Sequence, residues 1–367
     1  MKIPTRARYR LATQKAHEFI KENSINSLPV DPFVLADLMD VSLKTYTEVS
    51  IEKNQTLEET IKGFGSRDGI AALSDGVPGI FYNDTEIPSR VRFTIIHELG
   101  HIYLGHLDDF EETSFTRKNL SNEKYEVLER ETNCFARNVL APLPVVDSLE
   151  QINPKSLIEL FFISSGAAKA RLDFYALDIR NTQKALYTST KSQFAPFIFK
   201  LHNTHGCVHC GSIHISINPK FCSICGNKDL SKIKKTIGVE VSMRYSEIYY
   251  NADKRPIACP SCNNEMLQNG PYCQVCSRYV INQCTGLYED EINEYSSRIY
   301  WHSHQHGCEG TLSGDARFCS NCGSTSTYYE EGFLRSWNSD VQDPYIETVG
   351  ATKNGLLVAV ADEDLPF

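Results

Sequence analysis

The chain has 367 residues and a net charge of −9; 41% of its residues are hydrophobic and 23% are charged. This length predicts two or three domains, and the hydrophobic fraction excludes a wholly disordered chain. The negative charge argues against a protein that coats nucleic acid or anionic membrane along its whole length.

Up to about residue 180, the sequence predicts mainly helices with a few short strands. Hydrophobic residues recur at helical spacing over 5–21, 89–107 and 122–140, and Asp31-Pro32 begins a shorter helix. Two more short helices are expected between 157 and 180. The runs 41–46 and 79–83 are of β type and are bounded by Gly, Asp and Asn.

The helix expected over 89–107 carries the motif His97-Glu-Leu-Gly-His101. Positions i and i+4 share one face of a helix, so both imidazoles can bind one Zn²⁺. Glu98 projects beside the metal, where it can accept a proton from bound water. A chance match should not also fall on so hydrophobic a helix. The motif therefore predicts a catalytic zinc with Glu98 as general base.

A zinc of this type needs a third protein ligand, and the helix expected over 122–140 offers two acidic candidates. Glu129 and Asn133 are four residues apart and share one face, so Glu129 can bind zinc while the Asn133 amide orients a ligand histidine. Glu131 points roughly 160° away from Glu129 on a helical wheel. Glu129 is therefore the preferred ligand, and Glu131 is the alternative.

Four segments in this order resemble the ImmA/IrrE family of metallopeptidases, over about residues 5–180. They are Ser27-Leu-Pro-Val-Asp-Pro, Arg92-Phe-Thr-Ile-Ile-His-Glu-Leu-Gly-His-Ile-Tyr-Leu-Gly-His106, Glu129-x-Glu-x-Asn-x-Phe-Ala-x-x-x-Leu-Ala-Pro142 and Ile163-Ser-Ser-Gly-Ala-Ala-Lys-Ala-Arg-Leu172. The family often has Ala where Thr132 stands and Met where Ala141 stands. Neither position is a ligand.

The resemblance implies a cytoplasmic zinc endopeptidase of the gluzincin type. Such enzymes typically cleave a helix-turn-helix repressor. If the family's site residues are matched to this sequence, His97, His101 and Glu129 would hold zinc, and Glu98 would be the general base. The fold class expected is α+β, with a mainly helical zincin-like domain followed by two or three small β-rich zinc ribbons.

Cysteine and charge divide the rest of the chain. Of the 13 cysteines, all except Cys134 lie in the segment from Cys207 to Cys322. Residues 200–285 carry a net charge of +5, and residues 286–367 carry −10. We expect a peptidase domain at 1–182, a linker at 183–200, zinc ribbons at 201–250 and 251–290, a partial third ribbon at 291–330, and an acidic tail at 331–367.

Closely spaced cysteine pairs in a reducing compartment usually bind zinc. Two pairs of Cys-x₂-Cys knuckles each predict a closed structural site of four thiolates, because a tetrahedral ion has no further open position. Small units of this kind bury too little surface to fold without the metal. The ligands expected are Cys207, Cys210, Cys222 and Cys225 in the first ribbon, and Cys259, Cys262, Cys273 and Cys276 in the second.

A third unit has only three cysteines in this pattern. These are Cys308, Cys319 and Cys322; Gln305 stands where the remaining cysteine would be, and His304 or His306 could supply the fourth ligand. Cys134 and Cys284 are expected to be structural or free. The cofactors expected are therefore one catalytic and two or three structural Zn²⁺ ions.

The ribbons and the C-terminus suggest partners of different kinds. Basic side chains of the ribbons could contact phosphates of DNA, but recognition of a protein fits them equally well. The last residues, Leu365, Pro366 and Phe367, follow three acidic residues and resemble the acidic tip of bacterial single-stranded DNA-binding proteins. Such a tip would bind a replication or repair protein, with Phe367 in an apolar pocket and its carboxylate on a basic side chain.

The leading hypothesis is a regulatory zinc endopeptidase that cleaves a repressor or another regulatory protein. The alternatives are a zinc-ribbon adaptor without hydrolytic activity and a DNA-binding regulator. No hydrophobic segment follows the basic N-terminus, and no hydrophobic run is long enough to cross a bilayer. We therefore expect a cytoplasmic protein with no membrane partner.

Overall fold

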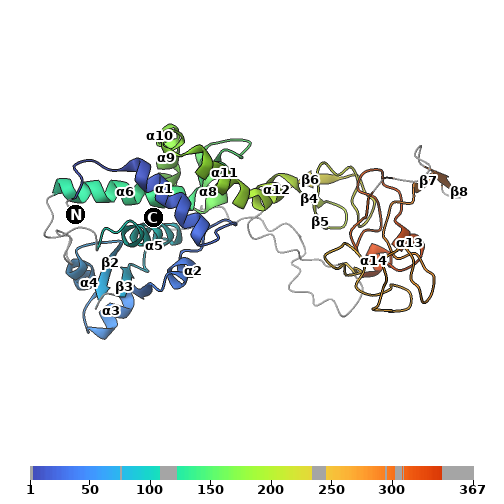
Figure 1. The fold of residues 1–367 in the computed structure, drawn as a ribbon, viewed down its shortest axis with the longest axis horizontal. Helices are drawn as coiled ribbons and strands as arrows, with labels where there is room; N and C mark the ends of the chain where they lie inside the picture. Colours follow the sequence, from blue (N-terminus) through green and yellow to red (C-terminus); the bar gives the residue numbers. More distant parts are fainter. Residues whose placement is uncertain are drawn as a thin grey trace. The chain divides into compact units, whose positions relative to one another are not determined.

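The computed structural model describes residues 3–74, 77–107, 122–233, 245–293, 296–301, 308 and 310–340. The chain forms two compact units, Met1–Phe199 and Lys200–Phe367, drawn in blue to green and in yellow to red in Figure 1. Among the residues described, no helix has the length and hydrophobicity needed to span a membrane. His304, His306 and the tip at Leu365, Pro366 and Phe367 lie outside the described ranges.

The first unit is mainly helical and contains one small sheet, as the sequence predicts. Its strands are β1 (Ser42–Thr45), β2 (Gly69–Ser74) and β3 (Val77–Tyr82). Its helices are α1 (Tyr9–Glu22), α2 (Pro32–Leu38), α3 (Tyr46–Glu52), α4 (Leu57–Phe64), α5 (Pro88–Tyr103), α6 (Asn122–Leu140), α7 (Leu143–Val146), α8 (Pro154–Phe161), α9 (Ser165–Asp173), α10 (Tyr175–Asn181) and α11 (Lys184–Gln193).

The sheet has the order β1-β3-β2, in which β1 runs parallel to β3 and β2 runs antiparallel to it. Strand β2 is therefore an edge strand, and it packs against α5. A Cβ at Gly69 would lie 2.5 Å from Cγ2 of Thr94, so this close contact between strand and helix requires glycine. The contact fixes β2 beside the helix that carries the His-Glu-x-x-His motif.

Helix α6 packs against both α1 and α5. Phe135 of α6 contacts Phe19 of α1 edge to face, with ring centroids 5.2 Å apart. A Cβ at Gly100 of α5 would lie 2.8 Å from Phe135 and 2.9 Å from Thr132. Glycine at the second x of the motif thus lets α5 and α6 approach closely enough to share a metal site.

The segment expected as a linker, 183–200, is helical and continues the first unit. Helix α11 packs against α1 and α7. The Tyr187 hydroxyl donates to Asp147 Oδ2 at 2.7 Å, and Phe194 is fully buried. Helix α12 (Ala195–Asn203) follows and leads along the chain into the second unit. Buried contacts of this kind attach α11 to the rest of the first unit, whereas a flexible linker would lack them.

The second unit is built from short strands and cysteine turns. Its strands are β4 (Thr204–Cys207), β5 (Ile213–Ile215) and β6 (Leu230–Lys232) in the order β5-β4-β6, and β7 (Leu287–Asn293) paired with β8 (Ser296–Trp301). Two short helices follow, α13 (Thr327–Glu330) and α14 (Trp337–Asp340). The whole chain is thus of the α+β class, with a helical domain followed by small β-rich modules.

Two of the cysteine turns in this unit pack on each other with approximate two-fold symmetry. The backbone N–H groups of Lys220 and Phe221 donate to the carbonyl of Ser320 at 2.8 and 3.1 Å. The N–H groups of Arg317 and Phe318 likewise donate to the carbonyl of Ser223, at 2.8 and 3.0 Å. The underlying sequences, Lys220-Phe-Cys-Ser-Ile-Cys-Gly226 and Arg317-Phe-Cys-Ser-Asn-Cys-Gly323, are near repeats.

Candidate metal centre

His97, His101 and Glu129 bring their ligand atoms together between α5 and α6. The two histidine Nε2 atoms are 3.2 Å apart, and each is 3.2 Å from an oxygen of Glu129. Zinc bonds of about 2.0–2.1 Å place tetrahedral ligand atoms about 3.3 Å apart, so the three residues fit one zinc ion. Burial raises the pKa of Glu129, but contacts with His101 and His97 outweigh it and hold that pKa far below its ordinary value.

Glu98 is buried beside this cluster and is held by the sheet. Its Oε2 accepts a hydrogen bond of 2.8 Å from the backbone N–H of Ala71 in β2. Because β2 packs against α5, this contact holds the carboxylate between the helix of the motif and the edge strand of the sheet. The position suits a group that accepts a proton from water at the metal.

The alternative ligand, Glu131, is part of a second network behind the site. His106 Nδ1 lies 3.1 Å from His101 Nδ1, and His106 Nε2 lies 3.2 Å from Glu131 Oε2. With His101 bound to metal through Nε2, its Nδ1–H donates to His106, and His106 Nε2–H donates to Glu131. Arg8 closes the network by donating from its backbone N–H and its guanidinium to Glu131, at 2.7 to 2.9 Å.

The charges of this network agree with that assignment. Burial lowers the pKa of His106 to about 4, so the ring is neutral near pH 7. Burial raises the pKa of Glu131, but hydrogen bonds from His106 and Arg8 outweigh it and bring the pKa to about 2. A neutral ring between a ligand histidine and an ionised carboxylate keeps a fixed tautomer.

Asn133 was expected to orient a ligand histidine, but the side chain in contact with the ring of His101 is that of His106. Asn133 is exposed, and within the described residues it donates no hydrogen bond to His97 or His101. It lines a cavity one helical turn beyond Glu129. Helical spacing alone could not reveal His106, because that residue lies past the end of α5.

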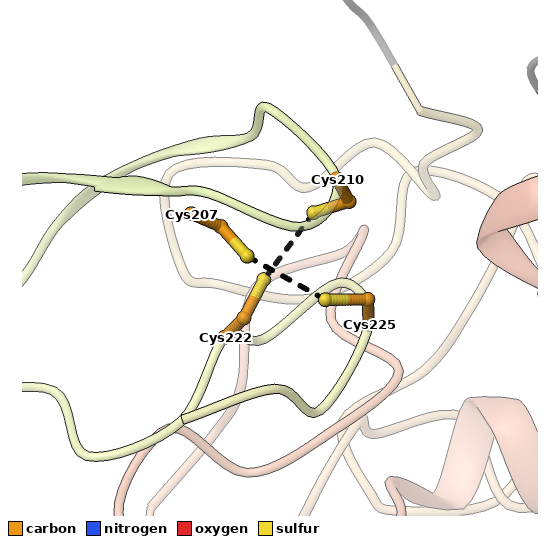
Figure 2. Close-up of side chains that lie close together, drawn as sticks. All are labelled: Cys207, Cys210, Cys222 and Cys225. Carbon is orange, nitrogen blue, oxygen red and sulfur yellow. Dashed lines mark hydrogen bonds between the residues drawn. The ribbon is translucent and has the colours of Figure 1, made fainter. Parts of the chain in front are cut away.

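The first two cysteine clusters assemble as the sequence predicts. Figure 2 shows Cys207, Cys210, Cys222 and Cys225 converging on one point, with sulfur–sulfur distances of 3.6 Å for Cys207–Cys225 and Cys210–Cys222. In the second cluster, Cys259–Cys276 and Cys262–Cys273 are 3.6 and 3.7 Å apart. Zn–S bonds of about 2.3 Å place tetrahedral sulfurs about 3.8 Å apart, so both clusters fit zinc.

The third cluster is completed by Cys284, which the sequence predicted to be structural or free. Cys284, Cys308, Cys319 and Cys322 bring their sulfurs together, with Cys284 and Cys322 3.4 Å apart. Cys284 precedes the expected start of this ribbon at residue 291. It thus fills the fourth position for which a histidine, His304 or His306, was considered. Cys134 lies apart, buried in α6 with its sulfur 3.4 Å from Thr13 Oγ1.

Comparison with known protein families gives a match within the first unit. A search of curated proteins gave no match. Residues 45–173 match the family model of the IrrE N-terminal-like domain, a peptidase family. This range includes Glu98 and the three residues of the candidate zinc site, and the family supports a zinc-dependent protease. Residues 45–173 are thus similar to the IrrE N-terminal-like domain of the Peptidase M78 family, and three four-cysteine clusters that fit zinc ribbons follow this range.

Proposed function

We propose that the chain is a zinc endopeptidase that cleaves a regulatory protein, with a helix-turn-helix repressor as the preferred candidate. The observation that carries the proposal is the shared geometry of His97, His101 and Glu129, with Glu98 buried beside them. Three protein ligands leave one position of a tetrahedral zinc open for water or substrate, as hydrolysis requires.

The residues of the chain have distinct roles in this reaction. Zinc, when bound, polarises the scissile carbonyl and lowers the pKa of water at the site. Glu98 accepts a proton from the attacking water on its carboxylate and passes it to the nitrogen of the leaving amine. The bond from Ala71 to Oε2 holds the carboxylate in place while Oε1 carries the proton. His106 and Glu131 keep the ring of His101 oriented.

The edge strand β2 supplies a surface for an extended substrate. Ala71 pairs with Ile80 of β3, and its N–H points away from β3 toward Glu98. The outer edge of β2 therefore faces Glu98, and a peptide added along this edge would lie in an extended conformation beside the general base. An exposed or unfolded segment of a regulatory protein can meet that requirement.

For the second unit, we infer recognition of a protein in preference to DNA. Lys228 lies over the ring of Phe221, and Arg255 donates hydrogen bonds to backbone carbonyls. Two of the basic side chains therefore make contacts within the second unit itself. The cysteine turns instead expose hydrophobic side chains, with Val208 76% and Val275 68% exposed. Exposed hydrophobic side chains on rigid turns suit contact with another protein.

The test uses the zinc-loaded full chain and a panel of purified helix-turn-helix repressors, with mass spectrometry of the fragments. We expect cleavage that a chelator abolishes, and no cleavage by Glu98→Gln, which should retain its zinc. Glu126→Gln is a matched control, because Glu126 is exposed on α6 and pairs with Arg130. A zinc-loaded Glu98→Gln protein that cleaves as fast as the wild type would overturn the mechanism.

A non-hydrolytic adaptor is the alternative, and it makes a different prediction. An adaptor would bind its partner equally well as the wild type and as the Glu98→Gln variant, and it would release no fragments from any substrate. The buried, strand-held position of Glu98 favours hydrolysis, since an adaptor has no use for a general base.

A further inference from the structure

A cavity of about 520 Å³ lies one helical turn from the metal ligands. Phe93, on its wall, is one turn before His97 on α5, and its ring centroid lies 5.9 Å from that of His97. Asn133, also on the wall, is one turn after Glu129 on α6. Helix α9 closes the cavity with Ser164, Gly166, Ala167 and Ala170. A side chain close to a bond cleaved at the metal could therefore enter it.

The wall of this cavity is mostly apolar, and several arginine side chains contribute to it. Its charged side chains are four arginines and one aspartate: Arg90, Arg130, Arg137, Arg171 and Asp68. Arg90 is neutralised by two hydrogen bonds to Asp68, at 2.8 and 2.9 Å, and Arg130 pairs with Glu126.

The two remaining guanidinium groups share a single carboxylate. Arg137 donates to both oxygens of Asp178 at 2.9 Å, and Arg171 donates from Nη1 to Oδ2 of the same residue. All three side chains are buried. These three side chains carry a net charge of +1, and the charge of Asp147 also acts on Arg171. Buried charges of this kind are stabilised when anions pair with them.

Arg171 shows where an anion would bind. It is fully buried and lines the cavity, and among the described residues its Nε and Nη2 atoms have no hydrogen-bond partner. Buried polar atoms nearly always have partners, so two unpaired N–H donors on one guanidinium indicate a missing acceptor. The Nε–H and Nη2–H groups lie on the same edge of the guanidinium, so they can donate one hydrogen bond to each oxygen of a carboxylate.

The N-terminus of α9 adds to the attraction for negative charge. Ser164 caps this nine-residue helix by accepting a hydrogen bond from Ala167 N–H at 3.2 Å. The positive end of the helix dipole therefore faces the same cavity as the two arginines.

We propose that this cavity binds the carboxylate of an acidic side chain, glutamate in preference to aspartate, in the polypeptide cleaved at the metal centre. The apolar wall formed by Ile87, Leu140 and Phe174 suits the longer stem of glutamate. The inference rests on the proposed function, because the occupant is part of the substrate. Arg171 and Arg137 are then specificity-determining residues.

The first test measures binding without catalysis. The probe is N-acetyl-glutamate amide, and its control is N-acetyl-glutamine amide, which differs only in the carboxylate. With the full chain carrying ¹⁵N-labelled arginine, we expect the acid to shift the Nε–H signal of Arg171 and the amide to leave it in place. Equal shifts with both compounds, or a shift with neither, would overturn the proposal.

The second test places a carboxylate in the cavity by mutation and needs no ligand. Ala170 lines the cavity from the second turn of α9, and Lys169 is exposed on the same helix. We expect Ala170→Glu to have a higher melting temperature than Ala170→Gln, whereas Lys169→Glu and Lys169→Gln should differ little. A glutamate at position 170 that stabilises no more than glutamine, relative to the control pair, counts against the site.

The third test is a peptide library cleaved by the zinc-loaded wild type and read by mass spectrometry. We expect glutamate at one position beside the scissile bond, with kcat/KM at least about tenfold above that of the glutamine peptide. Arg137→Gln should lose this preference and Arg180→Gln, an exposed residue of α10, should keep it. Cleavage with no acidic preference overturns the cavity assignment but leaves the peptidase standing. Carboxylate binding without cleavage of any peptide supports the cavity and refutes the peptidase.

Discussion

His106 lies against His101 because of the turn that ends α5. Gly105 adopts a left-handed conformation with φ of 70°, the His106 N–H donates to the His101 carbonyl, and the Gly105 N–H donates to Ile102. This is a Schellman motif, in which the residue after the glycine contacts the residue five positions before it. The helix end itself thus places a second imidazole on the metal ligand.

Glu131 fixes this second imidazole, so the first prediction concerns the affinity of the catalytic site for zinc. Glu131→Gln removes the charge that His106 and Arg8 share, and we expect zinc affinity at this site to fall about 10- to 100-fold. The measurement is competition with a chelator of known affinity. Glu126→Gln, an exposed change on the same helix, should leave the affinity unchanged. If Glu131→Gln and the wild type bind zinc with equal affinity, the network of His106, Glu131 and Arg8 does not contribute to metal binding.

The sequence predicted the candidate zinc ligands of the first unit because helical spacing fixes the relative positions of residues within one helix. His97 and His101 share a face whatever the tertiary structure, and the preference for Glu129 over Glu131 rested on the face that Glu129 shares with Asn133. Asn133 shares that face, yet it lies too far toward the cavity to meet a ligand ring. The orienting role passed to His106, whose position depends on a glycine turn and not on a repeat.

Cys284 was missed for a related reason. In the first two clusters, both knuckles are Cys-x₂-Cys pairs, and local spacing reveals all four ligands. In the third, the hairpin of β7 and β8 separates Cys284 from Cys308, so these two ligands meet only through tertiary structure. One signal was present in the sequence. Thirteen cysteines can form three sets of four with one left over, and Cys134 is the one that lies in the helical part of the chain.

The second prediction follows from this assignment and concerns the number of bound zinc ions. We expect the wild type to bind one zinc at each of the four clusters and Cys284→Ser to bind one fewer, because a three-thiolate site holds zinc more weakly. Native mass spectrometry gives the count. Cys134→Ala is the control and should keep the wild-type number. If Cys284→Ser retains every ion, another residue must complete the third site.

The third prediction concerns the symmetric contact between the first and third clusters. Phe221 lies against Gly323, and Phe318 lies against Gly226, so each turn packs its aromatic ring on the other's glycine. Phe318→Ala opens this contact, and we expect zinc to leave both clusters faster in the presence of chelator because metal binding and folding are coupled. The second cluster should release its zinc at the wild-type rate.

The control for this experiment is Tyr272→Ala, which removes an exposed aromatic side chain from the second cluster's module. It should not accelerate zinc loss from the first and third clusters. Faster loss from the third cluster alone after Phe318→Ala would show that the two turns fold independently, despite the backbone hydrogen bonds between them.

The last prediction concerns pH and the attachment of α11 to the head. His17 of α1 is buried, and its Nδ1 lies 2.7 Å from Thr190 Oγ1 of α11. Burial, reinforced by the nearby charge of Arg171, lowers the pKa of His17 from 6.5 to about 4. Between these two values the unfolded chain binds more protons than the folded one. The stabilisation is therefore complete above pH 6.5 and is lost as the pH falls toward 4.

A shift of this size corresponds to about 3 kcal/mol, as an upper estimate for one group. His17→Gln keeps a hydrogen-bonding side chain but cannot titrate, so its free energy of unfolding should fall less between pH 7 and pH 4.5 than that of the wild type. Urea denaturation of both proteins at the two pH values, with chelator present throughout, gives the difference between the two pH dependences. If both proteins lose the same free energy over this range, His17 carries no part of the acid sensitivity, and the contact with Thr190 does not depend on a neutral ring.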